Sequence, residues 1–460
     1  MLLRINSNIV LESDGSEIEA LFIKDNTFPN PEYLSNEQNG RAWANRDVSE
    51  EIYTYRREGG SLVLPRGYAR DFLRICEAHG ITPTIIDERA SAPCSYPEIL
   101  KGIVLRGYQQ RAVDSANKFY QGTIVSPTGS GKSLIGLEII RQKGEKALVL
   151  VHRSDLGKQW ASVIEERLGI VPGLIGDGSW EIGNEITIAM VQTLASRTEE
   201  TRGLSGSFGL VIWDEIQHLP SETHFNVLGL LNAKYRYGLS ATLNRRDGLE
   251  PIIYRTIGPT IATIEKEEVE KQGATVPAKV ISIETGFTPE SVNSWSEFLE
   301  SIASSIGRNN LIIDLAKKSD GSTLILVDRV KHAEELSAML KKIGIVHVLA
   351  HGQISKVDRC DVMDRIKSSQ ITVGTTGLLG EGIDVTSWGT LIMGSPISSE
   401  IKLMQAIGRC VRQSPGKQQA TIYDLKDDCG FAGSSFKKRF DIYKKNKIWV
   451  DFSKTQKRAV

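Results

Sequence analysis

The stretch Ser126-Pro127-Thr128-Gly129-Ser130-Gly131-Lys132-Ser133 decides the fold of this chain. An apolar, strand-like run precedes it at 123–125, and a helical pattern of apolar residues follows it at 134–140. Strand, glycine loop and helix in this order are the setting that a phosphate-binding loop requires. The two glycines let the backbone N–H groups turn inward, and the helix N-terminus adds the positive end of its dipole. The stretch therefore predicts a binding loop for the phosphates of a nucleotide.

The side chains of this loop suit ATP with Mg²⁺. Lys132 can reach the β- and γ-phosphates, and the Ser133 hydroxyl can ligate Mg²⁺. Ser126 stands where the motif G-x-x-x-x-G-K-[ST] has its first glycine. A Gly-Lys-Ser sequence by itself also occurs in ordinary loops that enter helices, so other segments have to support the assignment. The loop residues predicted to hold the nucleotide are Thr128, Gly129, Ser130, Gly131, Lys132 and Ser133.

Length and composition set the class of protein. A chain of 460 residues is too long for one core and should hold two or three domains. Its 40% apolar and 24% charged residues are typical of a soluble globular protein. The formal net charge is zero, so a nucleic-acid partner would have to be held by local patches.

The five cysteines show no C-x-x-C spacing, which argues against a zinc site and a disulfide framework and favours a reducing, cytoplasmic setting. No apolar run is long enough to span a membrane, and the N-terminus lacks the basic and apolar regions of a secretion signal.

Residues 1–98 are expected to form a small α+β domain. The pattern predicts strands at 2–5, 20–23, 51–57 and 62–64, a polar loop at 25–39 and an amphipathic helix at 68–79. Arginines interleave with tyrosines there: Arg56, Arg57, Arg66, Arg70 and Arg74 with Tyr53, Tyr55 and Tyr68. They can contact a nucleic-acid backbone and stack on bases, or they can form a solvated face over a small core. Both interpretations stay open.

The middle of the chain alternates apolar runs with helical patterns. Runs at 147–151, 186–190 and 209–213 are continuous, as in buried parallel strands. The alternation predicts a doubly wound α/β sheet whose ligands lie at the carboxyl ends of the strands.

Two adjacent carboxylates follow directly on one of these strands. Asp214 can serve as the Mg²⁺-associated acid, and Glu215 can polarise the attacking water. The alternative is a strand that ends in a charged, solvated turn. The phosphate loop upstream favours the catalytic interpretation.

Two further segments complete this half. Gln109, with Arg106 near it at the start of a helix, can both donate to and accept from the edge of an adenine ring. Ser240 and Thr242 lie at another strand end, where their hydroxyls can sense the γ-phosphate and couple it to a partner domain.

Together these segments resemble those of a superfamily 2 helicase. The matching segments, in chain order, are Tyr108-Gln109, 128–133, Asp214-Glu215 and Ser240-Ala241-Thr242. Within the superfamily, the chain is most similar to the XPB-like group and to phage branch-migration helicases of the UvsW type. The resemblance spans residues 102–428 and implies an α/β fold with two tandem RecA-like, doubly wound parallel-sheet domains behind the small N-terminal α+β domain.

The expected boundaries are 1–98 for an accessory domain that binds DNA, 99–270 for the ATP-binding domain, 271–435 for the second RecA-like domain, and 436–460 for a basic C-terminal helix and tail. The tail can pack on the second domain and contact DNA.

Two departures from the family pattern affect the expected roles. Arg246 replaces the glutamate of the XPB-like Arg-Glu-Asp triplet, which puts an unwinding role of that loop in doubt. Gln217 stands where many relatives have histidine, and His218 is displaced by one position. Coupling between the domains can therefore run through either residue.

The second half repeats the pattern without a phosphate loop, so one ATP is expected between two similar domains. Residues 278–283 are expected to begin the crossing segment, and runs at 323–327, 345–349 and 371–375 predict strands. Gly382 and Asp384 belong to a segment that resembles the family's G-x-G-x-D motif.

The stretch 405–412 matches Q-x-x-G-R-x-x-R. Gln405 belongs to the expected catalytic set. Arg409 and Arg412, three apart on one helix, are expected to share a face and to stabilise charge on the transferred phosphoryl group. The alternative is a basic surface helix.

The expected function is an ATP-dependent DNA helicase or translocase that remodels forks and junctions in replication, recombination or repair, as a monomer on DNA. The resemblance implies 3′–5′ polarity. Sequence-tolerant, salt-sensitive phosphate contacts are expected from Arg153, Thr193, Arg245, Thr375 and Thr376. A nucleic-acid-stimulated ATPase clamp, an RNA helicase and the motor subunit of a restriction complex remain alternatives.

Overall fold

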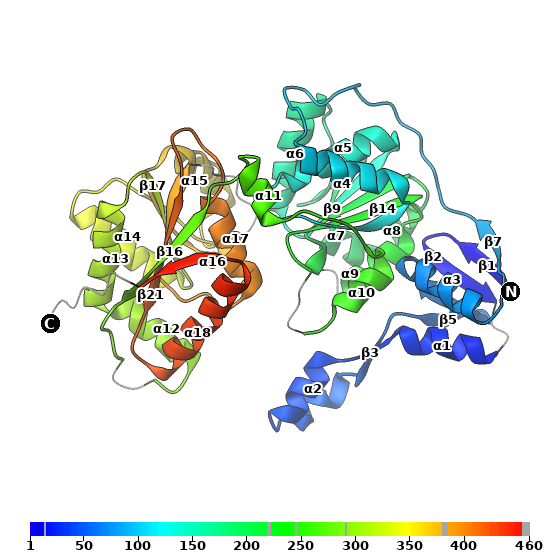
Figure 1. Ribbon diagram of the computed structural model, residues 1–460, viewed down its shortest axis with the longest axis horizontal. Helices are drawn as coiled ribbons and strands as arrows, with labels where there is room; N and C mark the ends of the chain where they lie inside the picture. Colours follow the sequence, from blue (N-terminus) through cyan, green and yellow to red (C-terminus); the bar gives the residue numbers. More distant parts are fainter. Residues whose placement is uncertain are drawn as a thin grey trace. The chain divides into compact units, whose positions relative to one another are not determined.

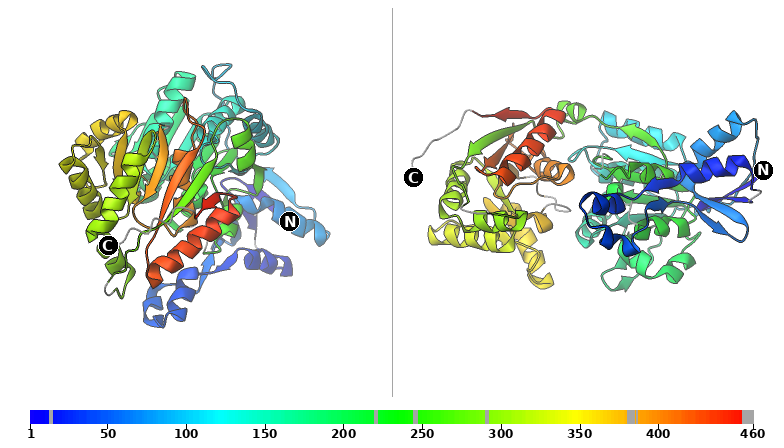
Figure 2. Two further views of the ribbon diagram at one scale, coloured as in Figure 1. Left: turned by 60° about the vertical axis from the view of Figure 1, so that its left-hand side comes forward. Right: turned by 90° about the horizontal axis from the view of Figure 1, so that it is seen from below.

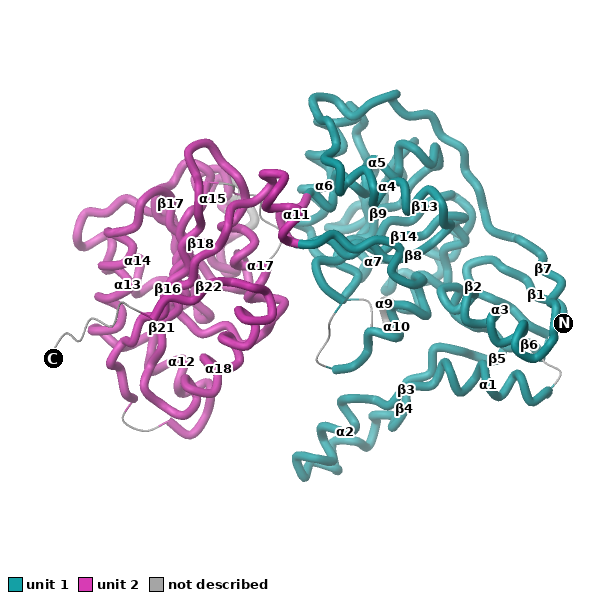
Figure 3. The backbone as a smooth tube through the Cα atoms, viewed as in Figure 1, with its two compact units in different colours: residues 1–127, 131–265 teal, residues 128–130, 266–460 magenta. Residues whose placement is uncertain are grey.

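The structure is a computed structural model of residues 1–460, and it describes residues 1–12, 15–218, 222–243, 247–289, 292–379, 385 and 387–452. The chain forms two compact units (Figure 3). The first contains residues 1–127 and 131–265, and the second contains residues 128–130 and 266–460.

The first unit begins with a small α+β domain (Figure 1). Its five-stranded sheet has the order β5-β6-β2-β1-β7. The strands are β1 (Leu2–Ile5), β2 (Asn8–Glu12), β5 (Arg56–Glu58), β6 (Ser61–Pro65) and β7 (Thr84–Asp87), and the helices are α1 (Glu17–Asp25) and α3 (Ala69–Ala78). Phe22 of α1 stacks on Phe72 of α3 with ring centroids 4.3 Å apart, which closes the core of this domain. The predicted small N-terminal α+β domain is confirmed.

Two local predictions in this domain are wrong. Residues 20–23 form part of helix α1, because Ile18 and Phe22, four residues apart, are both buried while Leu21 is 38% exposed. The predicted loop at 25–39 contains β3 (Thr27–Pro29) and α2 (Pro31–Gln38). Strand β3 pairs with β4 (Glu51–Tyr53), so the predicted strand at 51–57 is divided between two sheets. A 3₁₀ turn at Ala42–Asp47 completes this segment.

The rest of the first unit is an eight-stranded sheet with the order β11-β10-β12-β9-β13-β14-β8-β15. All its pairs are parallel except β10 with β11 at the edge. The strands are β8 (Gln121–Val125), β9 (Ala147–Val151), β10 (Gly173–Gly176), β11 (Ser179–Trp180), β12 (Ile186–Met190), β13 (Leu210–Asp214), β14 (Tyr235–Ser240) and β15 (Thr260–Thr263).

Helices cover both faces of this sheet. Those on one face are α4 (Gly107–Lys118), α5 (Lys132–Lys143) and α6 (Ser154–Leu168). The other face packs against α7 (Val191–Ser196), α9 (Glu222–Leu230) and α10 (Glu250–Thr256), with α8 (Thr198–Gly203) beside α7. Every residue of β9 is buried, which explains why its sequence is continuously apolar.

The second unit contains a seven-stranded sheet, parallel throughout its described strands, with the order β18-β19-β17-β20-β21-β16-β22. The strands are β16 (Ala278–Glu284), β17 (Ser322–Val327), β18 (Val348–Ala350), β19 (Ile371–Thr375), β20 (Trp388–Met393), β21 (Ala420–Lys426) and β22 (Trp449–Asp451). The helices are α11 (Lys266–Lys271), α12 (Trp295–Ser304), α13 (Ile306–Lys318), α14 (Val330–Lys342), α15 (Lys356–Ser368), α16 (Thr376–Leu379), α17 (Glu400–Cys410) and α18 (Gly430–Lys445).

Two core clusters lie on opposite faces of this sheet. One joins it to α13 and α14, and the other joins it to α15, α16, α17 and α18. Figure 2 shows α18 and the α13–α14 pair on opposite sides of the strands. The predicted pair of doubly wound parallel sheets is therefore confirmed.

Two predictions for the second half are wrong. Residues 278–283 lie within strand β16, paired with β21 and β22, and do not form a crossing segment. Helix α17 ends at Cys410, so Arg409 and Arg412 do not share a helix face. The chain leaves the helix there because Val276 N–H donates to the Val411 carbonyl (2.7 Å) and Thr275 forms a bridge with Arg412.

The basic C-terminal segment packs on the second sheet, as expected. Arg439 of α18 makes a two-pronged ion pair with Asp424 of β21 at 2.7–3.0 Å, and the Tyr443 hydroxyl donates to the same carboxylate (2.8 Å). Trp449 belongs to β22 and is 71% exposed. Residues 453–460 lie outside the described residues. Within the described residues, no helix is long and apolar enough to cross a membrane.

Candidate nucleotide and nucleic-acid site

The glycine loop has the backbone that its sequence predicts. Gly129 and Gly131 have φ of +88° and +83°, in the left-handed region that favours glycine. Gly131 caps α5, so Lys132 is the first residue of that helix. A Cβ atom on Gly131 would lie 2.5 Å from the amide nitrogen of Gln109, which leaves no room for a side chain. Ser126 is buried, and its N–H donates to the Ser240 carbonyl (2.8 Å).

Gln109 joins the start of α4 to this loop. Its side-chain oxygen accepts a hydrogen bond from the Arg106 N–H (2.8 Å), and the side chain is 1% exposed. Its amide nitrogen faces Gly131. Contact of Gln109 or Arg106 with an adenine ring stays a prediction.

The two acids at the end of β13 lie beside the loop lysine. Lys132 Nζ is 3.4 Å from Glu215 Oε1, and the two side chains are 12% and 13% exposed. Asp214 accepts hydrogen bonds on both oxygens, from Trp160 Nε1 (2.9 Å) and from the Glu215 N–H (3.0 Å). Glu215 itself has φ of +55°, a strained conformation for a side-chain-bearing residue and one that is found preferentially at functional sites. Asp214 and Glu215 are therefore held in place by specific contacts and do not form a solvated turn.

The surroundings shift the pKa values of the two carboxyl groups in opposite directions. Burial raises the pKa of Asp214, and the neighbouring charge of Glu215 raises it further. Burial also opposes the charge on Glu215, but the Lys132 ammonium, the Gln217 amide and two nearby imidazoles hold its pKa below the ordinary value. These neighbours therefore favour the ionised form of Glu215.

Gln217 connects the acidic pair to the end of β14. Its amide nitrogen donates to Glu215 Oε2, and its oxygen accepts from the Ser240 hydroxyl (2.7 Å). The Thr242 N–H in turn donates to the Ser240 hydroxyl oxygen (3.1 Å). The displaced histidine, His218, instead stacks on His152 with ring centroids 4.2 Å apart. Of the two residues considered for coupling, Gln217 is the one hydrogen-bonded between the acid and the hydroxyl segment.

The residues present fit a nucleotide with Mg²⁺. The left-handed glycines place the loop N–H groups at the start of α5, where the helix dipole favours an anion. Ser133 and Asp214 would supply oxygen ligands, because both Asp214 oxygens keep a lone pair beyond the hydrogen bonds they accept. No group of three or more protein ligands for a metal occurs within the described residues. Mg²⁺ bound through one carboxylate and substrate phosphates needs none.

Two residues predicted to contact nucleic acid follow the carboxyl ends of two adjacent strands of the first sheet. Arg153 follows β9, and Thr193 follows the neighbouring strand β12. Arg153 lies 3.6 Å from Asp155 and its side chain is 24% exposed. Gln192 donates to the His152 carbonyl (3.0 Å), which ties the two segments together. Arg245, predicted for the same role, lies outside the described residues.

The candidates in the second unit lie at the end of β19, at the start of α16 and within α17. Thr375 is buried at 4% exposure, whereas the Thr376 hydroxyl is partly exposed and donates to Asp328 Oδ1 (3.4 Å). Gln405 and Arg409 are buried in α17, and the Gln405 side-chain oxygen has no hydrogen-bond partner among the described residues. Gly382 and Asp384 lie outside the described residues. The roles assigned to this set stay predictions.

Two family models match the chain. The model described as "Type III restriction enzyme, res subunit" matches residues 102–245, and "Helicase conserved C-terminal domain" matches residues 307–414. "Probable helicase D10" of Escherichia phage T5 is 25% identical over 402 residues, which are 84% of this chain and 85% of that protein. "DNA 3'-5' helicase XPB" of Mycobacterium tuberculosis is 27% identical over 340 residues, 71% of this chain and 61% of that protein.

Among solved structures, "S. cerevisiae Dbp5 bound to RNA and ADP BeF3" aligns with a TM-score of 0.58 at 17% identity, over 76% of this chain and 90% of that one. At this identity the likeness concerns the fold.

Sequence reasoning missed the part played by Trp160. In the sequence, Trp160 looks like an ordinary apolar core residue of α6. In the structure, its indole N–H donates to Asp214 at the end of β13. A buried tryptophan usually needs a hydrogen-bond partner for its N–H, and this requirement is the only feature of the sequence that points to a polar contact of Trp160. We therefore regard Trp160 as a positioning residue for the predicted metal-associated carboxylate.

Trp160→Phe is expected to lower ATP turnover about tenfold, because a hydrogen bond to a charged group is lost while the aromatic volume stays. The Mg²⁺ concentration needed for half-maximal turnover should rise, since Asp214 is less firmly held. Trp388→Phe, at a buried tryptophan of the second unit, is the control for tryptophan truncation in general. Unchanged turnover and Mg²⁺ dependence in Trp160→Phe would refute the positioning role.

Proposed function

We propose that this chain, which is a superfamily 2 helicase and hydrolyses ATP, is a DNA translocase that unwinds or remodels forks and junctions with 3′–5′ polarity. The observation that carries the proposal is the hydrogen-bonded line from Glu215 through Gln217 to Ser240. It joins a proton acceptor for water to a segment able to report the state of the γ-phosphate. The name "DNA 3'-5' helicase XPB" of a relative supports the choice of DNA and the polarity.

In the proposed reaction, Lys132 and the loop N–H groups bind the phosphates, and Ser133 and Asp214 hold Mg²⁺. Bound Mg²⁺ supplies positive charge that offsets the negative charge on the phosphate oxygens. Glu215 orients a water molecule and accepts its proton, which its lowered pKa allows at neutral pH. Lys132 also balances the charge of Glu215 before the reaction, since the two lie 3.4 Å apart.

The second RecA-like domain would complete the site. Gln405, Arg409 and Arg412, with Gly382 and Asp384, would act from its side, and the arginines would stabilise charge on the transferred phosphoryl group. Closing and opening of the domains would move them along a strand held at its phosphates. The proposed contacts are Arg153, Thr193, Arg245, Thr375 and Thr376.

We further propose the division 1–98, 99–270, 271–435 and 436–460, action as a monomer, and a cytoplasmic location. Work in replication, recombination or repair, including branch migration, belongs to the same proposal, because forked and four-way DNA arises in those processes.

A strand-displacement assay tests the proposed function. Purified full-length protein is mixed with ATP, Mg²⁺ and a labelled fork carrying either a 3′ or a 5′ single-stranded tail. We expect displacement with the 3′ tail and none in Lys132→Ala. ATP hydrolysis without displacement on any DNA would favour the clamp, and displacement of RNA duplexes alone would favour an RNA helicase.

A further inference from the structure

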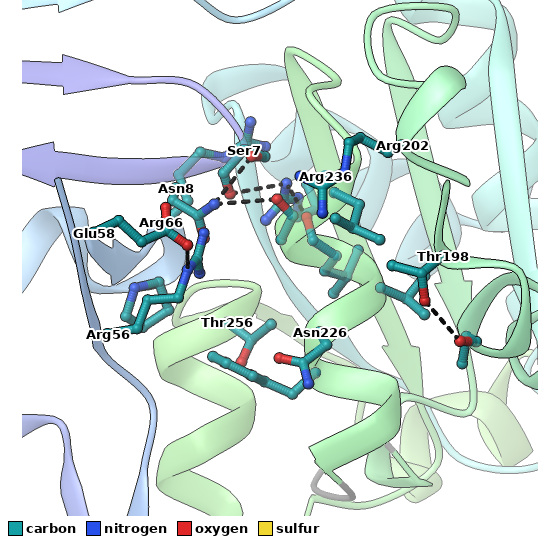
Figure 4. Close-up of a pocket in the computed structure, with 17 residues that line it drawn as sticks. Ser7, Asn8, Arg56, Glu58, Arg66, Thr198, Arg202, Asn226, Arg236 and Thr256 are labelled. Carbon is teal, nitrogen blue, oxygen red and sulfur yellow. Dashed lines mark hydrogen bonds and ion pairs between the residues drawn. The ribbon is translucent and has the colours of Figure 1, made fainter. Parts of the chain in front are cut away.

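A polar cavity of about 500 Å³ lies inside the first unit, where the small N-terminal domain meets the eight-stranded sheet (Figure 4). The N-terminal domain contributes Arg56 and Arg66, and the sheet with its helices contributes Arg202 and Arg236. Among the described residues of the lining, Glu58 is the one acidic residue. Four arginines against one glutamate give the cavity an excess of positive charge, and its volume is that of a site for a small molecule or a nucleotide.

Two of these arginines are buried and have no carboxylate partner among the described residues. Arg66 and Arg236 are each 1% exposed. Arg66 donates to the Gln121 side-chain oxygen (2.8 Å) and the Ala233 carbonyl (2.6 Å). Arg236 donates to the carbonyls of Leu228 (3.0 Å), Leu231 (2.8 Å) and Ser7 (3.3 Å).

Both guanidinium groups retain a nitrogen with no hydrogen-bond partner among the described residues: Nη2 of Arg66 and Nε of Arg236. Burial lowers the pKa of Arg236 to about 9, and burial followed by the charge of Arg236 lowers the pKa of Arg66. Buried charges are ordinarily paired, because an unpaired one costs several kcal/mol. Neutral oxygens accept hydrogen bonds from the two guanidinium groups, so positive charge remains in the wall of the cavity.

The other two arginines are free to move toward an incoming anion. The side chain of Arg56 is 46% exposed and lies 2.5 Å from Glu58, and that of Arg202 is 62% exposed and lies 3.7 Å from Glu199. Exposed pairs of this kind contribute little stability and exchange readily for a better partner. Asn226, which also lines the cavity, adds a neutral amide donor, while the Thr198 hydroxyl in the lining donates to the Ala195 carbonyl (3.1 Å).

We propose that this cavity binds a phosphate of a nucleic-acid backbone, as a second strand-binding site of the chain. The inference rests on the proposed function. A backbone phosphate suits the lining because arginines, hydroxyls and amides are the groups that hold it. The cavity is also lined by Ala195 of α7, the helix that carries Thr193. Arg236 is the second residue of β14 and lies four residues before Ser240, roughly 13 Å along the strand, so the cavity is separate from the nucleotide site.

The test measures single-stranded DNA binding by the full-length protein without nucleotide, over a range of NaCl concentrations. Each phosphate contact contributes about 0.7 to the slope of log affinity against log salt concentration on a single strand. We expect Arg56→Ala and Arg202→Ala each to reduce the slope by about this amount. Both side chains are largely exposed, so folding should be retained. Arg365→Ala is the matched control, since Arg365 of α15 is 58% exposed and makes a similar ion pair with Asp361 at 3.6 Å.

A second measurement separates a backbone phosphate from a free anion. Inorganic phosphate should raise the melting temperature in a Lys132→Ala background, where the nucleotide loop is weakened, and adding Arg202→Ala should reduce the shift. Slopes that match wild type in both cavity variants would overturn the proposal, and phosphate protection with unchanged slopes would show a site for free anions only. If the wild-type protein binds no DNA, both this inference and the proposed function fail. If the wild-type protein binds DNA normally and the cavity variants keep its salt slope, this inference alone fails.

Discussion

Lys132→Ala is expected to reduce ATP turnover at least about a hundredfold, the scale seen when one preorganised electrostatic group is removed from a reaction centre. The lysine acts twice in this structure. It is placed to bind phosphate oxygens at the start of α5, and it is the strongest influence that lowers the pKa of Glu215. Without Lys132, Glu215 is less readily ionised. The variant therefore loses a phosphate-binding group and also a part of the ionised carboxylate that is proposed to accept the proton. Steady-state ATP hydrolysis with saturating DNA measures the effect.

The matched control for this variant is Lys158→Ala, which removes an exposed lysine from α6. It should hydrolyse ATP at the wild-type rate. DNA binding by Lys132→Ala, measured without ATP, should stay near wild type because the proposed strand contacts lie elsewhere. A fully active Lys132→Ala protein would refute the assignment of the nucleotide site.

The sequence predicted the sheets well where burial leaves one choice. β9, β13 and β17 are buried on both faces, so their sequences are continuous apolar runs that fit no amphipathic helix. Residues 20–23 form an equally apolar run but only four residues long, and such a run fits either period. The helix could be recognised only once the packing of Phe22 on Phe72 was known.

The candidate site divides in the same way. The loop and the acid pair could be predicted because their chemistry is carried by neighbours in sequence, as in 128–133 and 214–215. The Trp160–Asp214 hydrogen bond joins residues from two elements, and no local pattern encodes it. Arg236 is similar: a charged residue inside a buried strand signals a special environment, but its partners come from carbonyls that only tertiary folding brings together.

The residue at which α17 ends also could not be predicted from the sequence. The spacing of Arg409 and Arg412 is helical, and the motif match suggested one continuous helix. A backbone hydrogen bond from Val276, far away in the chain, ends it at Cys410. Arg409 therefore projects from the helix and Arg412 from the extended segment that pairs with Thr275. If both arginines serve the same site, they approach it from different elements.

Under the proposed function, Arg409→Ala and Arg412→Ala should each lower ATP turnover on the order of a thousandfold, the effect of losing an arginine that stabilises the transferred phosphoryl group. Binding of ATP should change far less, because the arginines act on charge that develops during transfer. Arg→Lys at either position keeps the charge but loses the planar fork, so it should restore only a small part of the rate. Single-turnover hydrolysis and equilibrium nucleotide binding, measured on the same preparations, separate the two effects.

Arg439→Lys provides the contrast, because Arg439 is buried like Arg409 but pairs with Asp424 inside the second unit. Its replacement should lower the melting temperature, since a buried ion pair that loses its geometry leaves a poorly compensated charge. Turnover per folded molecule should remain near wild type. If Arg409 and Arg412 were only structural, their variants would behave like Arg439→Lys, with lost stability and preserved turnover. Lost turnover at wild-type stability would instead place both guanidinium groups at the phosphates, acting from the helix and from the extended segment beyond it.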